Sequence, residues 1–140
     1  MSFEAARADM VAAAQAALAT WAGTPSPLLL SFENQGLVDQ GTQFDPYLCV
    51  DMLLVSGEQL SLGATKVYAT YGQIHLVAHT RENAGTLLGL KILDHFLPYF
   101  QLKTFSLIRT QAARPAGAYP AQGWLCQPLV VPFWYHSLAT

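Results

Sequence analysis

Hydrophobic and polar residues alternate most clearly in the middle of the chain, between Pro46 and Thr80. In the second half of this segment, one face carries apolar side chains and the other carries polar ones: Ile74, Leu76 and Ala78 against Gln73, His75 and His79. A period of two residues is typical of a half-buried strand. The first half is almost continuously apolar, which predicts a strand covered on both faces. Because Gly57–Gly63 between the two halves is too long for a two-residue turn, we expect a long β-hairpin with a projecting tip.

Two further segments have helical spacing. The first predicted helix runs from Ser2, its N-cap, to Trp21, and places Met10, Ala14 and Ala17 on one face. The second predicted helix runs from about Ala84 to Phe96, with Asn83 as N-cap and Pro98 as its limit or a bend. Its apolar residues surround it almost completely, so we expect it to be buried by the sheet and by a second subunit.

The remaining segments complete the order of elements. Short strands are predicted at Leu28–Glu33 and Thr104–Thr110, a flexible loop at Ala112–Gln122, and a last strand from Gly123 to about His136. Pro128 and Pro132 lie four residues apart in that last strand, so their missing N–H groups are expected on the same side of it, which predicts an edge strand or a bulge. The order predicts a single α+β domain over residues 1–140, with a mainly antiparallel sheet, the projecting hairpin and two helices packed on the sheet.

The composition bears on how much of the domain's surface contacts other proteins. The chain has 140 residues, of which 52% are hydrophobic and 11% charged, whereas an average soluble protein has about 25% charged residues. This leaves two readings open: a surface covered by partners, or a well-buried monomer with a neutral polar coat. A net charge of -2 argues against nucleic-acid binding. The apolar run from Met10 is interrupted at Gly23, too early for a membrane span, and the charged start of the chain does not suit a secretory signal.

Residues suited to catalysis or metal binding are scattered. His75 and His79 are four apart, but four residues of strand cover about 13 Å, too far for two ligands of one metal. Asp51 inside an apolar strand is a site candidate if its pKa is raised, and otherwise a residue paired with a base or lying at an edge. Cys49 and Cys126 are expected to be reduced core thiols, with a disulfide as the alternative. We therefore predict no catalytic, cofactor-binding or metal-binding residues.

Several short motifs occur in an order that resembles a known family. They are the helix ending in Trp21, then Phe32-Glu33-Asn34, Pro46-Tyr47-Leu48, Leu60-Ser61-Leu62-Gly63, Tyr71-Gly72-Gln73-Ile74, Gly123-Trp124 and Val131-Pro132-Phe133-Trp134-Tyr135. This order resembles the tail terminator proteins of long-tailed bacteriophages and prophages, including the lambda-type group. The resemblance covers most of the chain and rests on order and spacing.

The resemblance implies a structural virion protein without catalysis or cofactor. Such proteins form a ring, in most cases a hexamer, that caps the tail tube, stops its polymerisation and offers a joining surface to the head-completion proteins. The implied location is the tail or neck of the virion, and the host cytoplasm during assembly. A closed ring of identical subunits needs a heterologous contact, in which one patch meets a different patch on the neighbour.

We expect the subunit and tube contacts to involve the hairpin tip, one loop arginine and two tryptophans: Glu58, Gln59, Leu60, Leu62, Arg81, Trp124 and Trp134. Two alternatives remain open. One is another ring component of the head-tail connector or the tail tube. The other is a small cytoplasmic enzyme or ligand-binding protein that uses Asp51, His75, His79 or Asp94 in a pocket.

Overall fold

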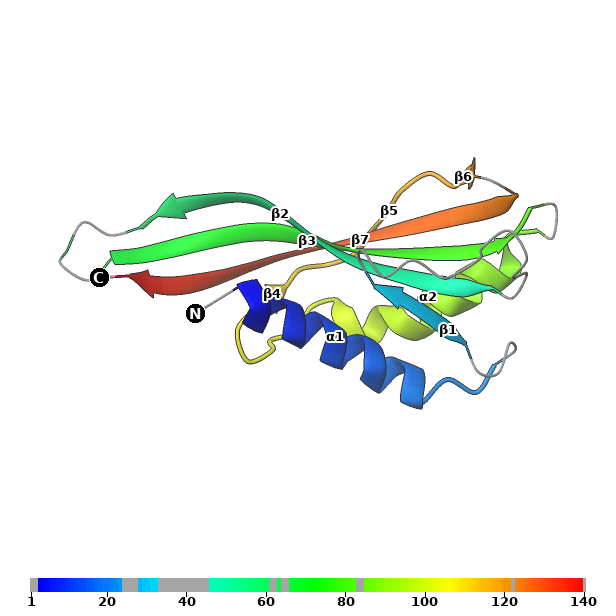
Figure 1. The fold of residues 1–140 in the computed structure, drawn as a ribbon, viewed down its shortest axis with the longest axis horizontal. Coiled ribbons are helices and arrows are strands. Elements are labelled where there is room, and N and C mark those ends of the chain that lie inside the picture. The colour runs from blue at the N-terminus through cyan, green and yellow to red at the C-terminus, as the bar shows by residue number, and fades with distance from the viewer. Residues whose placement is uncertain are drawn as a thin grey trace.

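The chain forms two helices packed on one strongly twisted sheet (Figure 1). The computed structural model describes residues 3–23, 28–32, 46–60, 63, 66–82, 85–121 and 123–139. Its elements are α1 (Phe3–Ala19), β1 (Leu29–Phe32), β2 (Tyr47–Gln59), β3 (Lys66–Arg81), α2 (Leu87–Phe100), β4 (Arg109–Thr110), β5 (Arg114–Pro115), β6 (Tyr119–Ala121) and β7 (Trp124–Ala139). The predicted α+β class is confirmed.

The predicted hairpin is present and forms the centre of the sheet. The strand order is β1-β2-β3-β7-β4, and the short strands β5 and β6 also pair with β7. Strands β2 and β3 pair antiparallel from Tyr47 opposite His79 to Gln59 opposite Tyr68, with a bulge between Leu54 and Ser56. Among the described strands only β1 is parallel to its neighbour, so the sheet is mainly antiparallel, as expected.

The core lies between the sheet and the two helices, which both cover the same face (Figure 1). The alternation predicted for β3 is confirmed, because Ile74, Leu76 and Ala78 are fully buried while the residues between them are half-buried. Helix α1 contributes mainly alanines to this core, and small side chains let a helix approach a sheet closely. Its predicted buried face is confirmed at Met10, Ala14 and Ala17.

Helix α2 extends further than predicted. It begins at Leu87, three residues after Ala84, and continues past Pro98 to Phe100. Pro98 removes only the bond that the Asp94 carbonyl would accept, and the buried ring of Phe100 keeps the last turn against the core. Thr86 occupies the N-cap position without a side-chain hydrogen bond, and the predicted cap Asn83 lies outside the described residues.

The strand predicted at Thr104–Thr110 is wrong, since only Arg109 and Thr110 form a strand. The chain turns back on itself here, because the Phe105 N–H donates to the Ile108 carbonyl at 2.9 Å. The Asp9 carboxylate accepts hydrogen bonds from Ser106 Oγ at 2.6 Å, Leu107 N at 2.9 Å and Ile108 N at 3.2 Å. A side chain of α1 thus supplies the acceptors that a neighbouring strand would otherwise provide.

Strand β7 is not an edge strand along most of its length, which corrects that prediction. It lies between β3 and a row of three short strands, β4, β5 and β6. The carbonyls of Pro128 and Pro132 accept from Ala116 N at 3.2 Å and Gln111 N at 2.8 Å, both on the side of the short strands. The N–H and C=O of one residue point to the same side of an antiparallel strand. Both missing N–H groups therefore face this interrupted side, as their spacing predicted.

The same pairing explains a second correction. The segment 112–122, predicted to be a flexible loop, contains β5 and β6. These short strands pair with β7 where its prolines allow it, opposite Leu129, Val130 and Trp124 among others. The last strand also continues beyond its predicted end at His136, to Ala139.

Candidate functional site

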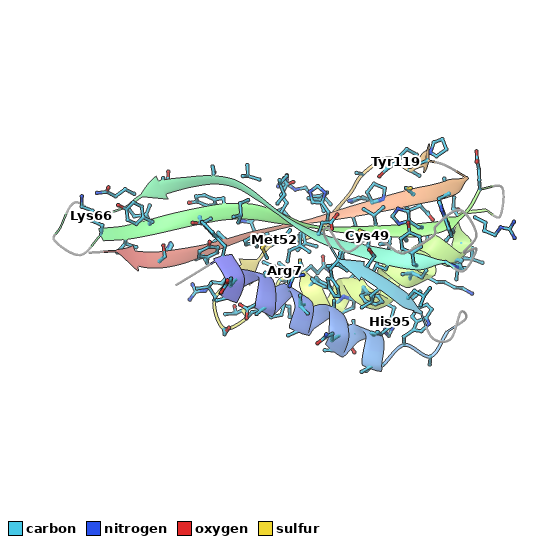
Figure 2. All side chains as sticks on the ribbon, in the orientation of Figure 1. Arg7, Cys49, Met52, Lys66, His95 and Tyr119 are labelled. Atoms are coloured by element: carbon cyan, nitrogen blue, oxygen red, sulfur yellow. The ribbon has the colours of Figure 1, made fainter. Side chains whose placement is uncertain are left out.

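At one end of the sheet, β2, β3 and β7 continue beyond the helices as a three-stranded extension, which we call the arm (Figure 1). The arm comprises residues 53–60 at the end of β2, 66–71 of β3 and 134–139 of β7. Lys66 lies at its far end (Figure 2). The projecting hairpin is therefore present, and β7 adds a third strand to it, down to Ala139 opposite Lys66. The sequence did not indicate this third strand.

Strand β2 exposes apolar side chains where it enters the arm. Leu53 is 51% exposed, Val55 58% and Leu60 48%. The prediction that this strand is covered on both faces holds for its first half, where Tyr47, Leu48 and Val50 are buried, and is wrong from Leu53 on. The helices do not extend under the far end of the sheet, so apolar surface there remains in contact with solvent (Figure 1).

A hollow of about 270 Å³ lies where the arm meets the start of α1. It is lined by Phe3, Leu54, Val55, Ser56, Gly57 and Thr70. Phe3 and Leu54 are themselves exposed large apolar residues. The hollow thus extends the apolar surface of β2 onto the first turn of α1.

The arm has an acidic residue on its β2 side, and an arginine of β4 lies beside its β7 side. On the β2 side, the Tyr71 hydroxyl donates to the Glu58 carboxylate at 3.3 Å. Partial burial raises the pKa of Tyr71, and the Glu58 charge adds to that shift. On the β7 side, the Arg109 guanidinium lies over the Trp134 ring, 5.1 Å from its centroid. Cation–π stacking of this kind holds the arginine in a defined position.

Both outer strands of the arm have an edge without a described partner strand. Strand β1 pairs with β2 only from Tyr47 to Val50. On the other side, β4 pairs with β7 only at Phe133 and Trp134. Within the part of the chain that the structure describes, no strand pairs with the outer side of β2 beyond Val50 or of β7 beyond Trp134.

The structure gathers most of the predicted tip residues on the arm. Glu58, Gln59 and Leu60 are exposed together at the end of β2. Trp134 is half-buried on β7, opposite Tyr71. Leu62 lies outside the described residues. The exposed Leu53 and Val55 were missed, although they come just before the polar tip and must project with it.

Arg81 and Trp124 lie opposite each other at the other end of the sheet. Arg81 is exposed. Trp124 is only 6% exposed and contacts the ring of Tyr47 edge-on, with centroids 5.2 Å apart. Trp124 therefore does not present an exposed ring to a neighbour, because most of its surface is used inside a small cluster with Tyr47 and Cys126.

The sheet face opposite the helices carries the ionisable residues that an enzyme would need to bring together. Asp51 lies directly across from His75, and Tyr47 across from His79. His75 Nε2 is 3.0 Å from Gln73 Oε1, and the Cys49 thiol donates to the Asp51 carboxylate at 3.6 Å. Asp94 is on α2, on the other side of the sheet. The structure thus brings Asp51 and His75 together and keeps Asp94 apart.

Burial governs the titration of the rings beside this pair. His79 stacks on Tyr47 with centroids 4.3 Å apart, and burial lowers the pKa of His79. Burial also raises the pKa of Tyr47 to about 12, so its phenol stays protonated at neutral pH. Among the described residues, no group of three or more His, Cys, Asp and Glu side chains is placed to hold a metal ion.

The two cysteines form no disulfide within the described part of the chain and lie on the strands that flank β3. Cys49 is opposite Val77 and Cys126 is opposite His79, so the two thiols are two positions apart along the sheet as well as two strands apart. Burial raises the pKa of Cys126 and keeps its thiol protonated. These contacts agree with the expectation of reduced thiols.

Helix α2 leaves part of its apolar surface uncovered. Its sheet-facing side is buried, but Leu87 and Leu90 are exposed. A second hollow, of about 250 Å³, is lined by Leu90, Leu93, Asp94, Leu97, Gln101, Ala113, Pro115 and Leu129. Cover by a second subunit therefore stays a prediction for this helix. No helix among the described residues is long and apolar enough to cross a membrane.

Comparisons with known proteins inform the fold alone. No family model and no curated protein matches the chain. A solved structure known only by a sequence identifier is similar in fold, with a TM-score of 0.58. The two chains are 14% identical, and the similarity covers 96% of this chain and 97% of the other. The architecture is thus shared over nearly its whole length, at an identity too low to transfer a function.

Proposed function

We propose that this chain is a structural protein of the bacteriophage tail, which assembles into a ring and terminates the tail tube. The observation that carries the proposal is the arm, which presents exposed apolar residues and two open strand edges at one end of a well-packed domain. The order of sequence motifs supplies the family, because it resembles the tail terminators.

Assembly into a ring would cover both the exposed apolar side chains and the open strand edges of the arm. Large exposed apolar side chains and open strand edges are usually avoided in proteins that remain monomers, because they promote association. The two edges are on opposite strands, so one copy can use its β2 side while its neighbour uses its β7 side. This is the heterologous contact that closes a ring.

In the proposed assembly the ring has three kinds of partner. Copies of the chain contact each other laterally, one rim of the ring meets the last ring of tail tube protein, and the other rim receives a head-completion protein. The exposed tip residues Glu58, Gln59 and Leu60 are placed to reach the tube or a neighbour.

The test uses Leu60→Glu in a phage or prophage that encodes this chain. On the terminator proposal, the variant folds, because Leu60 is about half exposed, but particles carry overlong or unjoined tails in electron micrographs. Leu102→Glu, after the end of α2 and 71% exposed, is the control for a charge placed on an exposed leucine outside the arm. Tails of normal length with Leu60→Glu, together with a purified protein that stays monomeric when tail tubes are added, would refute the proposal.

A neighbouring structural role is tested by location. If the chain is instead a component of the head-tail connector or the tube itself, labelled copies appear in the neck or at every repeat of the tube. A terminator appears once, at the head-proximal end of the tube.

One observation favours a different class of function, namely Asp51 lying across from His75 on the open face of the sheet. A carboxylate beside an imidazole is a common acid–base arrangement. On this alternative, Asp51→Asn with His75→Gln abolishes activity and leaves tail length unchanged. On the terminator proposal the same double variant assembles tails normally. Neither side chain lines the two hollows described above.

A further inference from the structure

We infer that copies of this chain join head to tail by extending the sheet: the outer edge of β2, from Met52 to Glu58, pairs in parallel with the outer edge of β7, from Tyr135 to Ala139, of the next copy. The inference deepens the proposed function, on which it rests, by naming the contact between neighbours in the ring.

The β2 edge lacks most of the protection that monomeric proteins give to edge strands. Natural edges carry lysine or proline, or are kept short. Met52–Glu58 reads MLLVSGE and contains neither lysine nor proline. Two of its leucine and valine side chains are more than half exposed, Leu53 and Val55. The bulge between Leu54 and Ser56 twists this edge locally but leaves stretches of strand on both sides.

The β7 edge supplies a second strand on the opposite side of the same arm. Beyond Trp134, five residues of β7 pair with β3 on one side and with no described strand on the other. A strand of this length is close to the average strand in a sheet. One copy thus offers both halves of the proposed contact, so no other protein is needed to complete it.

The strand directions favour a parallel pairing. Strands β2 and β7 are both antiparallel to β3, so they run the same way. In a ring whose axis lies roughly along the strands, β7 of one copy therefore meets β2 of the next in parallel. Strand β1 already pairs in parallel with the same edge of β2, from Tyr47 to Val50. The neighbouring β7 would continue along this edge where β1 ends.

The charged residues near the two edges favour the head-to-tail contact over a symmetric dimer. The β2 strand carries Asp51 and Glu58, whereas the strands beside β7 carry Arg109 and Arg114. In the head-to-tail contact, Asp51 at the start of the β2 edge comes near Arg109, which pairs opposite Trp134 at the start of the β7 edge. A two-fold contact between two β2 edges in antiparallel register would set Asp51 of one copy beside Glu58 of the other. Like charges across strands are destabilising, so the head-to-tail contact is favoured.

Two backbone N–H groups are the points to test, and their direction follows from the pairing. Leu60 N donates to the Val67 carbonyl, so Leu60 faces β3 and Gly57, three residues earlier, faces outward. On β7, the Pro128 and Pro132 carbonyls face outward, so His136, at the same parity, faces outward too. Proline at either position removes one outward donor and no bond to β3.

The experiment measures assembly of purified full-length protein by native mass spectrometry and analytical ultracentrifugation. Gly57→Pro and His136→Pro are compared with Gly57→Ala and His136→Ala, which keep the N–H. We expect the alanine variants to form the wild-type oligomer and each proline variant to be monomeric. Each proline variant keeps one intact edge, so an equimolar mixture of the two is expected to form a heterodimer and nothing larger.

Each outcome has a defined meaning. Wild-type rings that persist in both proline variants overturn the sheet-extension contact and leave the ring itself standing. Disruption by Gly57→Pro alone, without rescue by mixing, indicates pairing of two β2 edges and also overturns it. A wild-type protein that stays monomeric at every concentration, and with tail tubes added, overturns the proposed function together with the contact.

A measurement on the wild-type protein covers the case in which a proline variant does not fold. Hydrogen exchange of peptides spanning 52–58 and 135–139 is expected to slow by at least about tenfold in the oligomer, because their outward amides become hydrogen-bonded. Equal exchange in both peptides before and after dilution to monomer would contradict the inference.

Discussion

The two ends of the sheet differ in what covers them. At the helix-covered end, β3 and β7 bury alternate side chains against α1 and α2, and the core residues there are close to fully buried. At the arm, the same two strands continue with β2 but without helices beneath them, and Leu53, Val55 and Leu60 face solvent. The comparison shows that the hydrophobic pattern of a strand does not by itself decide whether its side chains are buried in the core or exposed. One continuous strand serves the core at one end and an exposed surface at the other.

The largest expected difference between the two ends comes from truncating apolar side chains. Phe96→Ala, in the core, is expected to lower the free energy of unfolding by about 3 to 5 kcal/mol, because it leaves a cavity. Leu53→Ala, on the arm, is expected to change it by less than about 1 kcal/mol, because its side chain is half exposed. Urea denaturation followed by circular dichroism measures both. Equal losses of unfolding free energy for Phe96→Ala and Leu53→Ala would contradict the comparison, because Leu53 would then be packed as tightly as a core residue.

Glycine substitutions sharpen the boundary between the two ends. A Cβ at Gly72 would lie 2.5 Å from the Phe133 ring and 2.6 Å from the Leu53 carbonyl oxygen. Gly72→Ala is therefore expected to cost about 1 to 3 kcal/mol in thermal or urea unfolding.

Gly57→Ala is the matched control, because a Cβ there comes no closer than 3.4 Å to the Ala69 carbonyl oxygen. We expect this variant to be neutral or slightly stabilising, since alanine loses less backbone entropy than glycine in a strand. A larger loss of unfolding free energy for Gly57→Ala than for Gly72→Ala would contradict the boundary between the tightly packed part of the sheet and the arm.

The Asp9 carboxylate is expected to matter nearly as much, because it connects α1 to the turn before β4. It accepts three hydrogen bonds there. Asp9→Asn replaces the charged acceptor of two backbone N–H groups with a neutral amide oxygen and loses the carboxylate acceptor of Ser106, so it is expected to cost about 1 to 2 kcal/mol. Faster amide exchange at Leu107 and Ile108 would locate the loss. Glu4→Gln, on the same helix and exposed, serves as the control, and identical unfolding curves for both variants would refute this role.

The smallest expected effect is a dependence of stability on pH from His79. Burial lowers the pKa of this imidazole below its ordinary value of 6.5. Between the lowered pKa and 6.5 the unfolded chain binds more protons than the folded one, so stability falls as the pH drops through this window. Urea midpoints at pH 7.5 and 5.5 measure the slope.

The variant His79→Gln is expected to have a shallower slope than the wild type in this window. A wild-type slope that His79→Gln does not reduce would show that the stacking of His79 on Tyr47 leaves the ring open to protonation.

The elements that depend on local pattern could be predicted from the sequence. The alternation of Ile74, Leu76 and Ala78 indicated both the strand and its buried face. The glycine-bearing segment between the apolar runs indicated a hairpin with a tip, and the spacing of Pro128 and Pro132 indicated that both lack an N–H on one side. The fold class and the buried face of α1 followed from the same periodicities.

The elements that depend on distant contacts could not be predicted. The turn at 104–109 is held by Asp9, about 100 residues earlier, and no local pattern reports such a contact. The position of β7 between β3 and the short strands is a property of strand order. The exposure of Leu53 and Val55 depends on where the helices end, because apolar strands look alike whether or not a helix lies beneath them. Hydrophobic periodicity in the sequence thus determined the two helices, the hairpin of β2 and β3 and the last strand, because their patterns are local. The tertiary arrangement alone decided the short strands beside β7 and which strand edges and apolar side chains stay open to a neighbour.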